Sequence, residues 1–261
     1  MTMNLDWDNT LAAIWRPNRA TLRAVKRMDP ICFDDLLGID RQKGEFRENL
    51  ELFLGGAKGN NTLLWGSRGT GKSSLVKAAL NHYAAKGLRV VEIDKDDLGD
   101  LIEIVDELRE LPQRFLIFCD DLSFDEGETT YKHLKSVLEG SIESPPENVL
   151  VCATSNRRHL ITEQQTDNDG VQIVEGELHY RDRVEEKLSL ADRFGLWLSF
   201  YPNSTEQYLA IVDDLFADFI IGDKAHLYLA ARQFAMTRAS KSGRTARQFY
   251  VQYHRSFRSD R

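Results

Sequence analysis

One eight-residue stretch constrains this chain more than any other, the run Gly66-Ser-Arg-Gly-Thr-Gly-Lys-Ser73. It fits the pattern G-x-x-x-x-G-K-[ST], known as Walker A, at every required position. The short apolar segment Thr62–Trp65 precedes it, and a helical pattern from Gly71 follows it. A glycine-rich turn between a strand and a helix cradles phosphate, because its N–H groups converge and the helix dipole adds positive potential. The stretch therefore predicts a nucleotide site.

Each residue type in the loop has a physical task. The glycines let the backbone curl, Lys72 can reach the β- and γ-phosphates, and the Ser73 hydroxyl can ligate Mg²⁺. ATP and Mg²⁺ are therefore the expected ligands. The alternative, a glycine-rich turn with an incidental Lys-Ser pair, is disfavoured because the motif follows a strand and opens a helix. The loop residues expected to bind the nucleotide are Gly66, Ser67, Arg68, Gly69, Thr70, Gly71, Lys72, Ser73 and Ser74.

Two acids, Asp120 and Asp121, follow the apolar run Phe115–Cys119. Such a run is typical of a strand buried on both faces, and ligands of parallel sheets bind outside the carboxyl ends of the strands. Asp120 is expected to hold Mg²⁺, and Asp121 to orient or deprotonate the attacking water. In the alternative interpretation, one of the two caps the following turn and the other alone is chemical.

Strand and helix signals alternate from Asn61 onward, which indicates a parallel sheet with crossover helices. Strands are expected at Thr62–Trp65, Leu88–Ile93, Phe115–Cys119, Val149–Ala153 and Leu196–Tyr201. Helices are expected at Gly71–Lys86, Asp97–Leu111 and Thr129–Gly140, and, after Pro202, from the starts Ser204, Asp223 and Ser242. The fold class is thus α/β: a three-layer P-loop NTPase domain with a parallel five-stranded sheet and a small C-terminal helical lid.

Three parts follow from this pattern. Residues 1–32 are expected to form an N-terminal helical extension, residues 33–202 the α/β nucleotide-binding domain, and residues 203–261 the helical lid. Residues 157–187 turn polar and acidic, which indicates an insertion on the rim of the sheet, with a small hairpin around 171–180.

The N-terminal part carries a basic stretch without an intervening acid. A helix packed on the main domain with a solvated charged face explains it, and a contact for an acidic partner or nucleic acid is the alternative. The stretch consists of Arg16, Arg19, Arg23, Lys26 and Arg27, with Leu11, Ile14, Leu22 and Val25 as its apolar residues.

Composition narrows the class of protein. The 261 residues carry a formal net charge of −7, which does not indicate nucleic acid as the partner. Three scattered cysteines argue against a disulfide framework, and the six histidines show no spacing typical of zinc ligands. The N-terminus lacks the pattern of a secretory signal, and no apolar run is long enough to span a membrane. A reduced, soluble, cytoplasmic protein is expected.

With the loop and the acid pair in place, the chain resembles the AAA+ ATPases. Phe33-Asp-Asp-Leu-Leu-Gly-Ile39 is similar to their segment over the adenine, which implies that Leu37 and Ile39 pack against the base; an ordinary core contact is equally compatible. Val149–Asn156 resembles the strand called sensor 1, which implies that Asn156 places the water, with Thr154 as the fallback. Many of these ATPases have Glu where Asp121 stands, so a slow ATPase or a nucleotide switch stays open.

Two arginine positions extend the resemblance. Ser189-Leu-Ala-Asp-Arg-Phe-Gly195 is similar to the arginine-finger segment, which implies that Arg193 reaches the site of a neighbouring subunit; a salt bridge with Asp192 or Glu186 is the alternative. Ser242-Gly-Arg-Thr-Ala-Arg-Gln248 resembles sensor 2, which implies that Arg244, or else Arg247, binds the phosphates from the lid. Within the class, the run from Glu185 to Tyr201 most resembles the DUF815 ATP-binding proteins.

The resemblance implies a homo-oligomeric ATPase that remodels a macromolecular partner. The alternative is a nucleotide-dependent switch, loader or adaptor with negligible turnover. Polypeptide threading is disfavoured, because the segment Lys95–Asp100 is acidic and lacks the aromatic-x-Gly loop of threading machines. Nucleic acid remains a secondary hypothesis that rests on the local basic stretch and on the arginines near the C-terminus. No membrane partner is expected.

Overall fold

A mostly parallel sheet of seven strands forms the core of the computed structural model, which describes residues 5–123, 131–140, 144–156, 190, 192–219 and 221–257. The strand order is β2-β1-β4-β5-β6-β3-β7. β2 pairs antiparallel with β1, and every other neighbouring pair is parallel. The strands are β1 (Ala12–Arg16), β2 (Thr21–Ala24), β3 (Thr62–Gly66), β4 (Leu88–Ile93), β5 (Arg114–Cys119), β6 (Val149–Ser155) and β7 (Leu196–Phe200).

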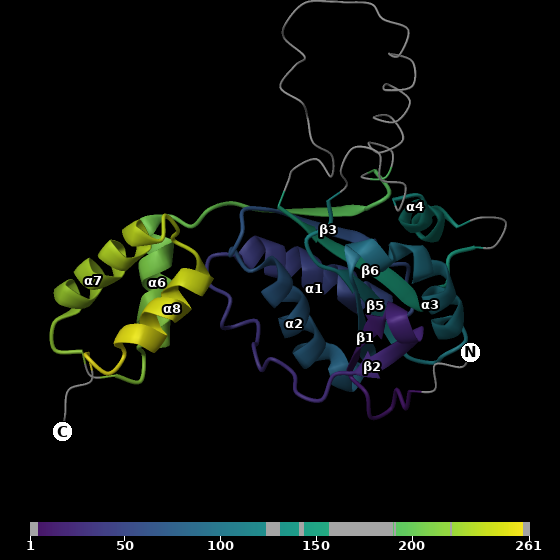
Figure 1. The fold of residues 1–261 in the computed structure, drawn as a ribbon, viewed down its shortest axis with the longest axis horizontal. Helices are drawn as coiled ribbons and strands as arrows, with labels where there is room; N and C mark the ends of the chain where they lie inside the picture. Colours follow the sequence, from purple (N-terminus) through teal and green to yellow (C-terminus); the bar gives the residue numbers. More distant parts are fainter. Residues whose placement is uncertain are drawn as a thin grey trace, which may run out of the picture.

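Helices cover both faces of the sheet, because successive strand residues point to opposite sides. In β5, Phe115, Ile117 and Cys119 belong to the hydrophobic cluster shared with α3 (Leu101–Leu108) and α4 (Tyr131–Glu139). The intervening Leu116 and Phe118 belong to the cluster shared with α1 (Asp40–Leu54) and α2 (Lys72–Tyr83). This three-layer α/β/α arrangement confirms the predicted fold class (Figure 1).

The predicted strand number was too low, and the predicted N-terminal helix was wrong. The five predicted strands correspond to the contiguous parallel set β4-β5-β6-β3-β7, and the N-terminal part adds β1 and β2. The basic and apolar residues of this part suggested a helix packed on the main domain with a solvated charged face. Pro17 instead begins a short 3₁₀ turn between the two strands, and β1 pairs with the distant β4, which spacing along the chain cannot reveal.

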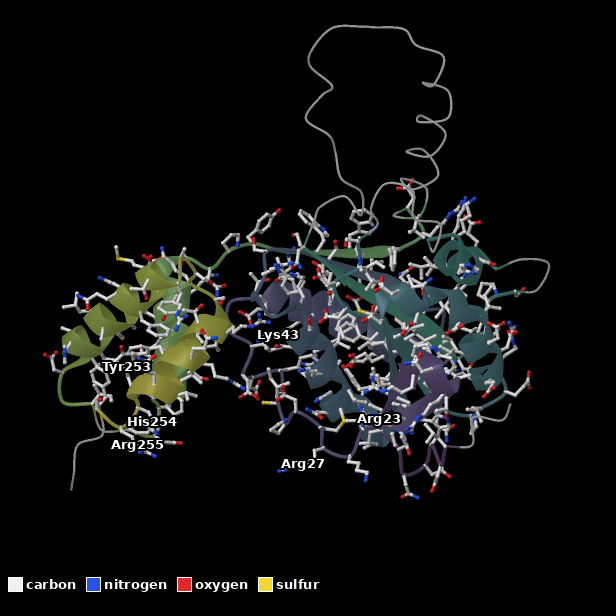
Figure 2. All side chains as sticks on the ribbon, in the orientation of Figure 1. Arg23, Arg27, Lys43, Tyr253, His254 and Arg255 are labelled. Atoms are coloured by element: carbon white, nitrogen blue, oxygen red, sulfur yellow. The ribbon has the colours of Figure 1, made fainter. Side chains whose placement is uncertain are left out.

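The basic residues of this hairpin have a structural account. β2 is the edge strand of the sheet, and exposed charges on an edge strand hinder pairing with another sheet. Arg16, Arg19 and Arg23 are exposed, and Figure 2 shows Arg23 and Arg27 at the outer border of the α/β domain.

One predicted helix differs in its first part. The segment expected to be helical from Asp97 begins as the 3₁₀ helix Lys95–Asp100 and continues as α3. The Asp94 carboxylate accepts a hydrogen bond from the backbone of Asp96 and so fixes the start of the 3₁₀ turn.

The C-terminal residues form a separate helical bundle of α6 (Thr205–Leu215), α7 (Lys224–Thr237) and α8 (Gly243–Tyr253). The side chains of Ser204, Asp223 and Ser242 cap these helices, as predicted. The bundle has its own hydrophobic cluster and follows the extended segment after β7 (Figure 1). Within the described ranges, no helix is long and apolar enough to cross a membrane. The predicted rim insertion at 157–187, with its hairpin, lies outside the described residues.

A glycine at the end of β3 yields the first prediction. Gly66 has φ 133°, and a Cβ there would lie 2.0 Å from the carbonyl oxygen of Phe200 in the paired strand β7. The backbone of Phe200 cannot move away without breaking the pairing of β3 with β7. We therefore expect Gly66→Ala to lower the free energy of unfolding by about 2 kcal/mol or more, measured by chemical denaturation.

The matched control is Gly44→Ala in the interior of α1. No atom lies within 4 Å of the added Cβ, and alanine favours helix, so we expect a gain of about 0.5–1 kcal/mol. Equal effects of the two substitutions would contradict the close approach of β7 to Gly66.

Candidate nucleotide-binding site

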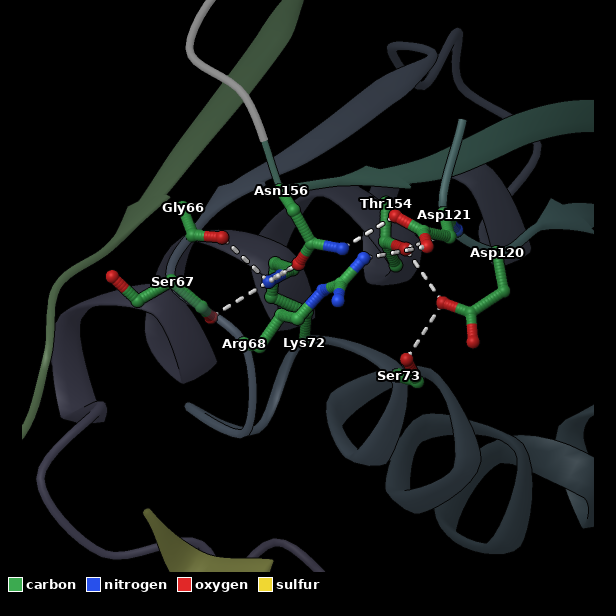
Figure 3. Close-up of polar contacts among 9 residues, drawn as sticks. All are labelled: Gly66, Ser67, Arg68, Lys72, Ser73, Asp120, Asp121, Thr154 and Asn156. Carbon is green, nitrogen blue, oxygen red and sulfur yellow. Dashed lines mark hydrogen bonds and ion pairs between the residues drawn. The ribbon is translucent and has the colours of Figure 1, made fainter. Parts of the chain in front are cut away.

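The site lies where three neighbouring parallel strands end. β3 ends at Gly66, β5 at Cys119 and β6 at Ser155, and the order β5-β6-β3 places these ends side by side. Polar residues that follow parallel strands meet at the same edge of the sheet. Figure 3 shows the loop after β3, the acid pair after β5, and Asn156 after β6 around one space.

The loop after β3 has the shape that its glycines allow. Gly69 (φ 74°) and Gly71 (φ 101°) adopt the left-handed region, and α2 begins directly after Gly71. The Thr70 hydroxyl donates to the Ser67 carbonyl at 2.8 Å and closes the turn. The free N–H groups at the start of α2 therefore face the same space as the loop, an arrangement that favours an anion.

Lys72 lies at the centre of the loop. Its ammonium donates to the carbonyls of Gly66 and Ser67, each at 2.8 Å, and to Asn156 Oδ1 at 3.0 Å. Burial lowers the pKa of this ammonium, whereas the nearby carboxylates of Asp120 and Asp121 act in the opposite direction. A buried cation whose acceptors are all neutral is well suited to bind a phosphate, which offers stronger charge-assisted hydrogen bonds.

Asp120 lies beside the Ser73 hydroxyl at the start of α2. Its Oδ1 accepts from Ser73 Oγ at 2.7 Å and from the buried Thr154 Oγ1 at 2.5 Å. A hydroxyl and a carboxylate this close are the hard oxygen ligands that Mg²⁺ takes when it also binds substrate phosphates. The pair fits a magnesium site at the position that the sequence predicted.

Asp121 has an unusual backbone conformation. Its φ of 55° lies in the left-handed region, which aspartate tolerates better than most residues. Its N–H donates to Thr154 Oγ1 at 2.8 Å, and its carboxylate accepts from Asn156 Nδ2 and lies 3.6 Å from Arg68. Thr154, the predicted fallback for sensor 1, therefore fixes both acids, while Asn156 bridges Asp121 and Lys72.

A cleft of about 810 Å³ contains these groups and extends to the lid. Ile39 and Leu37 line it. Ile39 packs near the phosphate loop, since a Cβ built on Gly71 would lie 3.4 Å from Ile39 Cδ1. The lid contributes Asn203, Ile211, Asp214, Leu215, Gly243, Arg244 and Arg247. Because both arginines line the cleft, the choice between them as the phosphate ligand stays open.

The lid touches the phosphate loop directly. The N–H of Gly243 donates to the Gly69 carbonyl at 3.2 Å, and a Cβ on Gly69 would lie 2.6 Å from Ser242 Cβ. The start of α8 therefore packs directly on the loop. A movement of the lid must break or change these contacts at Gly69.

Arg193 is not among the residues that line the cleft. Its Nε pairs with Glu139 of α4 at 2.6 Å, and 46% of its side chain is exposed. The partner thus differs from the expected alternatives: Asp192 makes no ion pair with Arg193 among the described contacts, and Glu186 lies outside the described residues.

Sequence reasoning missed Glu92 of β4. Glu92 pairs with Phe118 in the parallel ladder, and it lines the cleft together with Asp120. Burial raises the pKa of Glu92, and the Asp120 carboxylate raises it further. The signal was present in the sequence, because an acid interrupts the otherwise apolar strand Leu88–Ile93, but its position beside Asp120 depends on strand register.

The fold and the cleft are those of the AAA+ class of P-loop ATPases. The chain belongs to a particular family of that class. The model described as "Protein of unknown function (DUF815)" matches residues 8–256.

Curated relatives support the class over part of their length. The proteasome-activating nucleotidase of Methanopyrus kandleri is 28% identical over 173 residues, which is 56% of this chain and 39% of that protein. The protein of the same name from Thermococcus gammatolerans is 30% identical over 158 residues, or 50% of this chain and 39% of that protein. The chain thus spans well under half the length of these relatives.

Solved structures share the fold. The AAA domain of FIGL-1 in complex with ADP is 19% identical with a TM-score of 0.52, covering 80% of this chain and 68% of that chain. A variant of Thermotoga maritima RuvB is 16% identical with a TM-score of 0.50, and the match covers 85% of this chain and 72% of that chain. At these identities, the likeness shows the fold alone.

The contacts of Thr154 yield the second prediction. Thr154→Val keeps the side-chain shape but removes the hydroxyl that binds Asp120 and the Asp121 backbone. Loss of such a supporting contact weakens metal binding by about tenfold or more. We therefore expect the Mg²⁺ dependence of nucleotide binding, measured by calorimetry, to shift to higher Mg²⁺ concentration.

Thr62→Val is the matched control, at the opposite end of the neighbouring strand β3. Thr62 is also buried, and its hydroxyl contacts Asn49 and the Asn60 carbonyl. Both substitutions should cost about 1–2 kcal/mol of stability. A change in Mg²⁺ dependence that is equal in both variants would contradict the assignment of Thr154.

Proposed function

We propose that this chain binds ATP with Mg²⁺ in the cleft and hydrolyses it to ADP and phosphate, as a homo-oligomer that remodels a macromolecular partner. One observation carries the proposal: Lys72, Asp120, Asp121 and Asn156 converge on one space beside the phosphate loop. The AAA+ class supports nucleotide binding, and the acid pair beside the phosphate loop supports hydrolysis.

Nucleotide binding is divided among three parts of the cleft. Leu37 and Ile39 pack against the adenine, the loop N–H groups and Lys72 bind the phosphates, and Arg244 approaches from the lid. Ser73 and Asp120 would hold Mg²⁺, which would supply positive charge to stabilise the phosphate groups when bound.

Hydrolysis requires a water molecule opposite the bond that breaks. Asn156 orients this water, and Asp121 accepts one of its protons as the water oxygen bonds to the γ-phosphorus. The bond from the γ-phosphorus to the bridging oxygen breaks, and ADP leaves with that oxygen. Lys72 stabilises the charge on the oxygens of the transferred group.

Arg193 completes the site of a neighbouring subunit in this proposal. The side chain is half-exposed, outside its own cleft, and held by Glu139, so its direction is set before the subunits meet. An arginine supplied from another chain stabilises charge in the transition state of phosphoryl transfer. An isolated subunit is therefore expected to turn over slowly.

A macromolecular partner is inferred from the class, since the curated relatives above are proteasome-activating nucleotidases. A cytoplasmic location is consistent with the free thiols of Cys119 and Cys152, which are buried in the core. A nucleotide switch with little turnover is the second candidate, because the Asp121 carboxylate is already engaged by Asn156 and Arg68.

Mixing two inactive variants tests the neighbour's arginine. Asp121→Asn removes the base but keeps the arginine, and Arg193→Ala removes the arginine but keeps the base. Each alone should lose about 10²-fold or more of its turnover. A mixture should recover part of the rate, measured by phosphate release, because some clefts then pair an intact base with an intact arginine.

The control for Arg193→Ala is Glu139→Gln, which removes the ion pair but keeps the arginine. We expect Glu139→Gln to retain most of the turnover, because the arginine is still present. No recovery in the mixture of Asp121→Asn and Arg193→Ala would contradict an arginine supplied in trans. A wild-type rate at background level, with nucleotide still bound, would favour the switch.

A further inference from the structure

Arg68 is the third residue of the phosphate loop, where the pattern allows any residue. The backbone on both sides of it is fixed, because the Thr70 hydroxyl binds the Ser67 carbonyl and the Gly69 carbonyl accepts from Gly243 of the lid. Its side chain is 78% exposed. In Figure 3 the guanidinium lies between the loop and the acid pair.

The contact of this guanidinium is with Asp121. Arg68 Nη2 lies 3.6 Å from Asp121 Oδ2, and the carboxylate is itself 58% exposed. An ion pair in this setting contributes little to stability, because water screens both charges. The arginine can therefore leave Asp121 at small cost.

A phosphate group binds the Arg68 guanidinium more strongly than the Asp121 carboxylate does in this contact. Guanidinium groups bind phosphate oxygens through paired, charge-assisted hydrogen bonds. Arg68 also lies close enough to Lys72 for the two cations to repel each other. An anion between them relieves that repulsion.

We propose that Arg68 exchanges partners when ATP binds, leaving Asp121 for the γ-phosphate. The loop itself thereby supplies an arginine in cis, in addition to the arginine from the neighbouring subunit. The same movement removes one of the two contacts that engage the Asp121 carboxylate, so that the base becomes available to accept a proton once a triphosphate is in place.

This inference deepens the proposed function at the same site, and one half of it does not depend on hydrolysis. ADP lacks the γ-phosphate, so Arg68 must distinguish ATP from ADP in binding alone. The exchange also predicts that Arg68 and Asp121 are coupled in their effect on triphosphate affinity. Removal of the competing carboxylate should raise that affinity only when the arginine is present.

The test compares affinities for ADP and for a non-hydrolysable ATP analogue by calorimetry with Mg²⁺. Arg68→Ala should lower the affinity for the ATP analogue by about tenfold, as expected for the loss of a charge-assisted hydrogen bond, and change the affinity for ADP by less than about twofold. Asp121→Asn should raise the affinity for the analogue when Arg68 is present, and raise it much less in the Arg68→Ala background.

Arg109→Ala is the control, because Arg109, directly after α3, also forms an ion pair, with Asp106 at 3.4 Å, and does not line the cleft. It should leave both affinities unchanged. Melting temperatures without nucleotide verify that each variant is folded, and Arg68→Lys provides a second variant with an intermediate loss.

Two results would overturn the inference: an equal loss of ADP and analogue affinity in Arg68→Ala, or no loss of either. Wild-type protein that binds the analogue but does not hydrolyse ATP would refute the proposed hydrolysis and still test Arg68 through the affinity ratio. Wild-type protein that binds neither nucleotide would refute both.

Discussion

The buried ammonium group of Lys72 is the charge around which the site is arranged. A cation removed from water must be compensated by hydrogen bonds, and here two loop carbonyls and Asn156 provide them. These contacts join the end of β3 to the end of β6 before any ligand is present. The loop is therefore formed in advance, which reduces the rearrangement needed when phosphate replaces the neutral acceptors.

The remaining contacts differ in strength, and this difference separates fixed parts from movable ones. Thr154 is buried and holds Asp120 and the backbone of Asp121, so the acid pair keeps its position. Arg68 and the Asp121 carboxylate are exposed and weakly paired. The contact between the lid and Gly69 is intermediate between the buried contacts of Thr154 and the exposed pair of Arg68 and Asp121. It consists of one backbone hydrogen bond and the close approach of Ser242.

Local chemistry predicted most of the fold and much of the site. The phosphate loop and the caps at Ser204 and Asp223 are encoded within a few residues, and the acid pair follows from one buried strand. The N-terminal hairpin was missed because β1 depends on pairing with the distant β4. Glu92 was missed for the same reason, since strand register brings it beside Asp120.

ATP turnover per subunit over a wide dilution series, with oligomeric state measured in the same samples, tests the central claim most directly. Our account predicts a rate that falls as the oligomer dissociates, because each cleft then loses its neighbour's Arg193 while its own loop and acid pair stay intact. A rate per subunit that stays constant while the oligomer dissociates would contradict it.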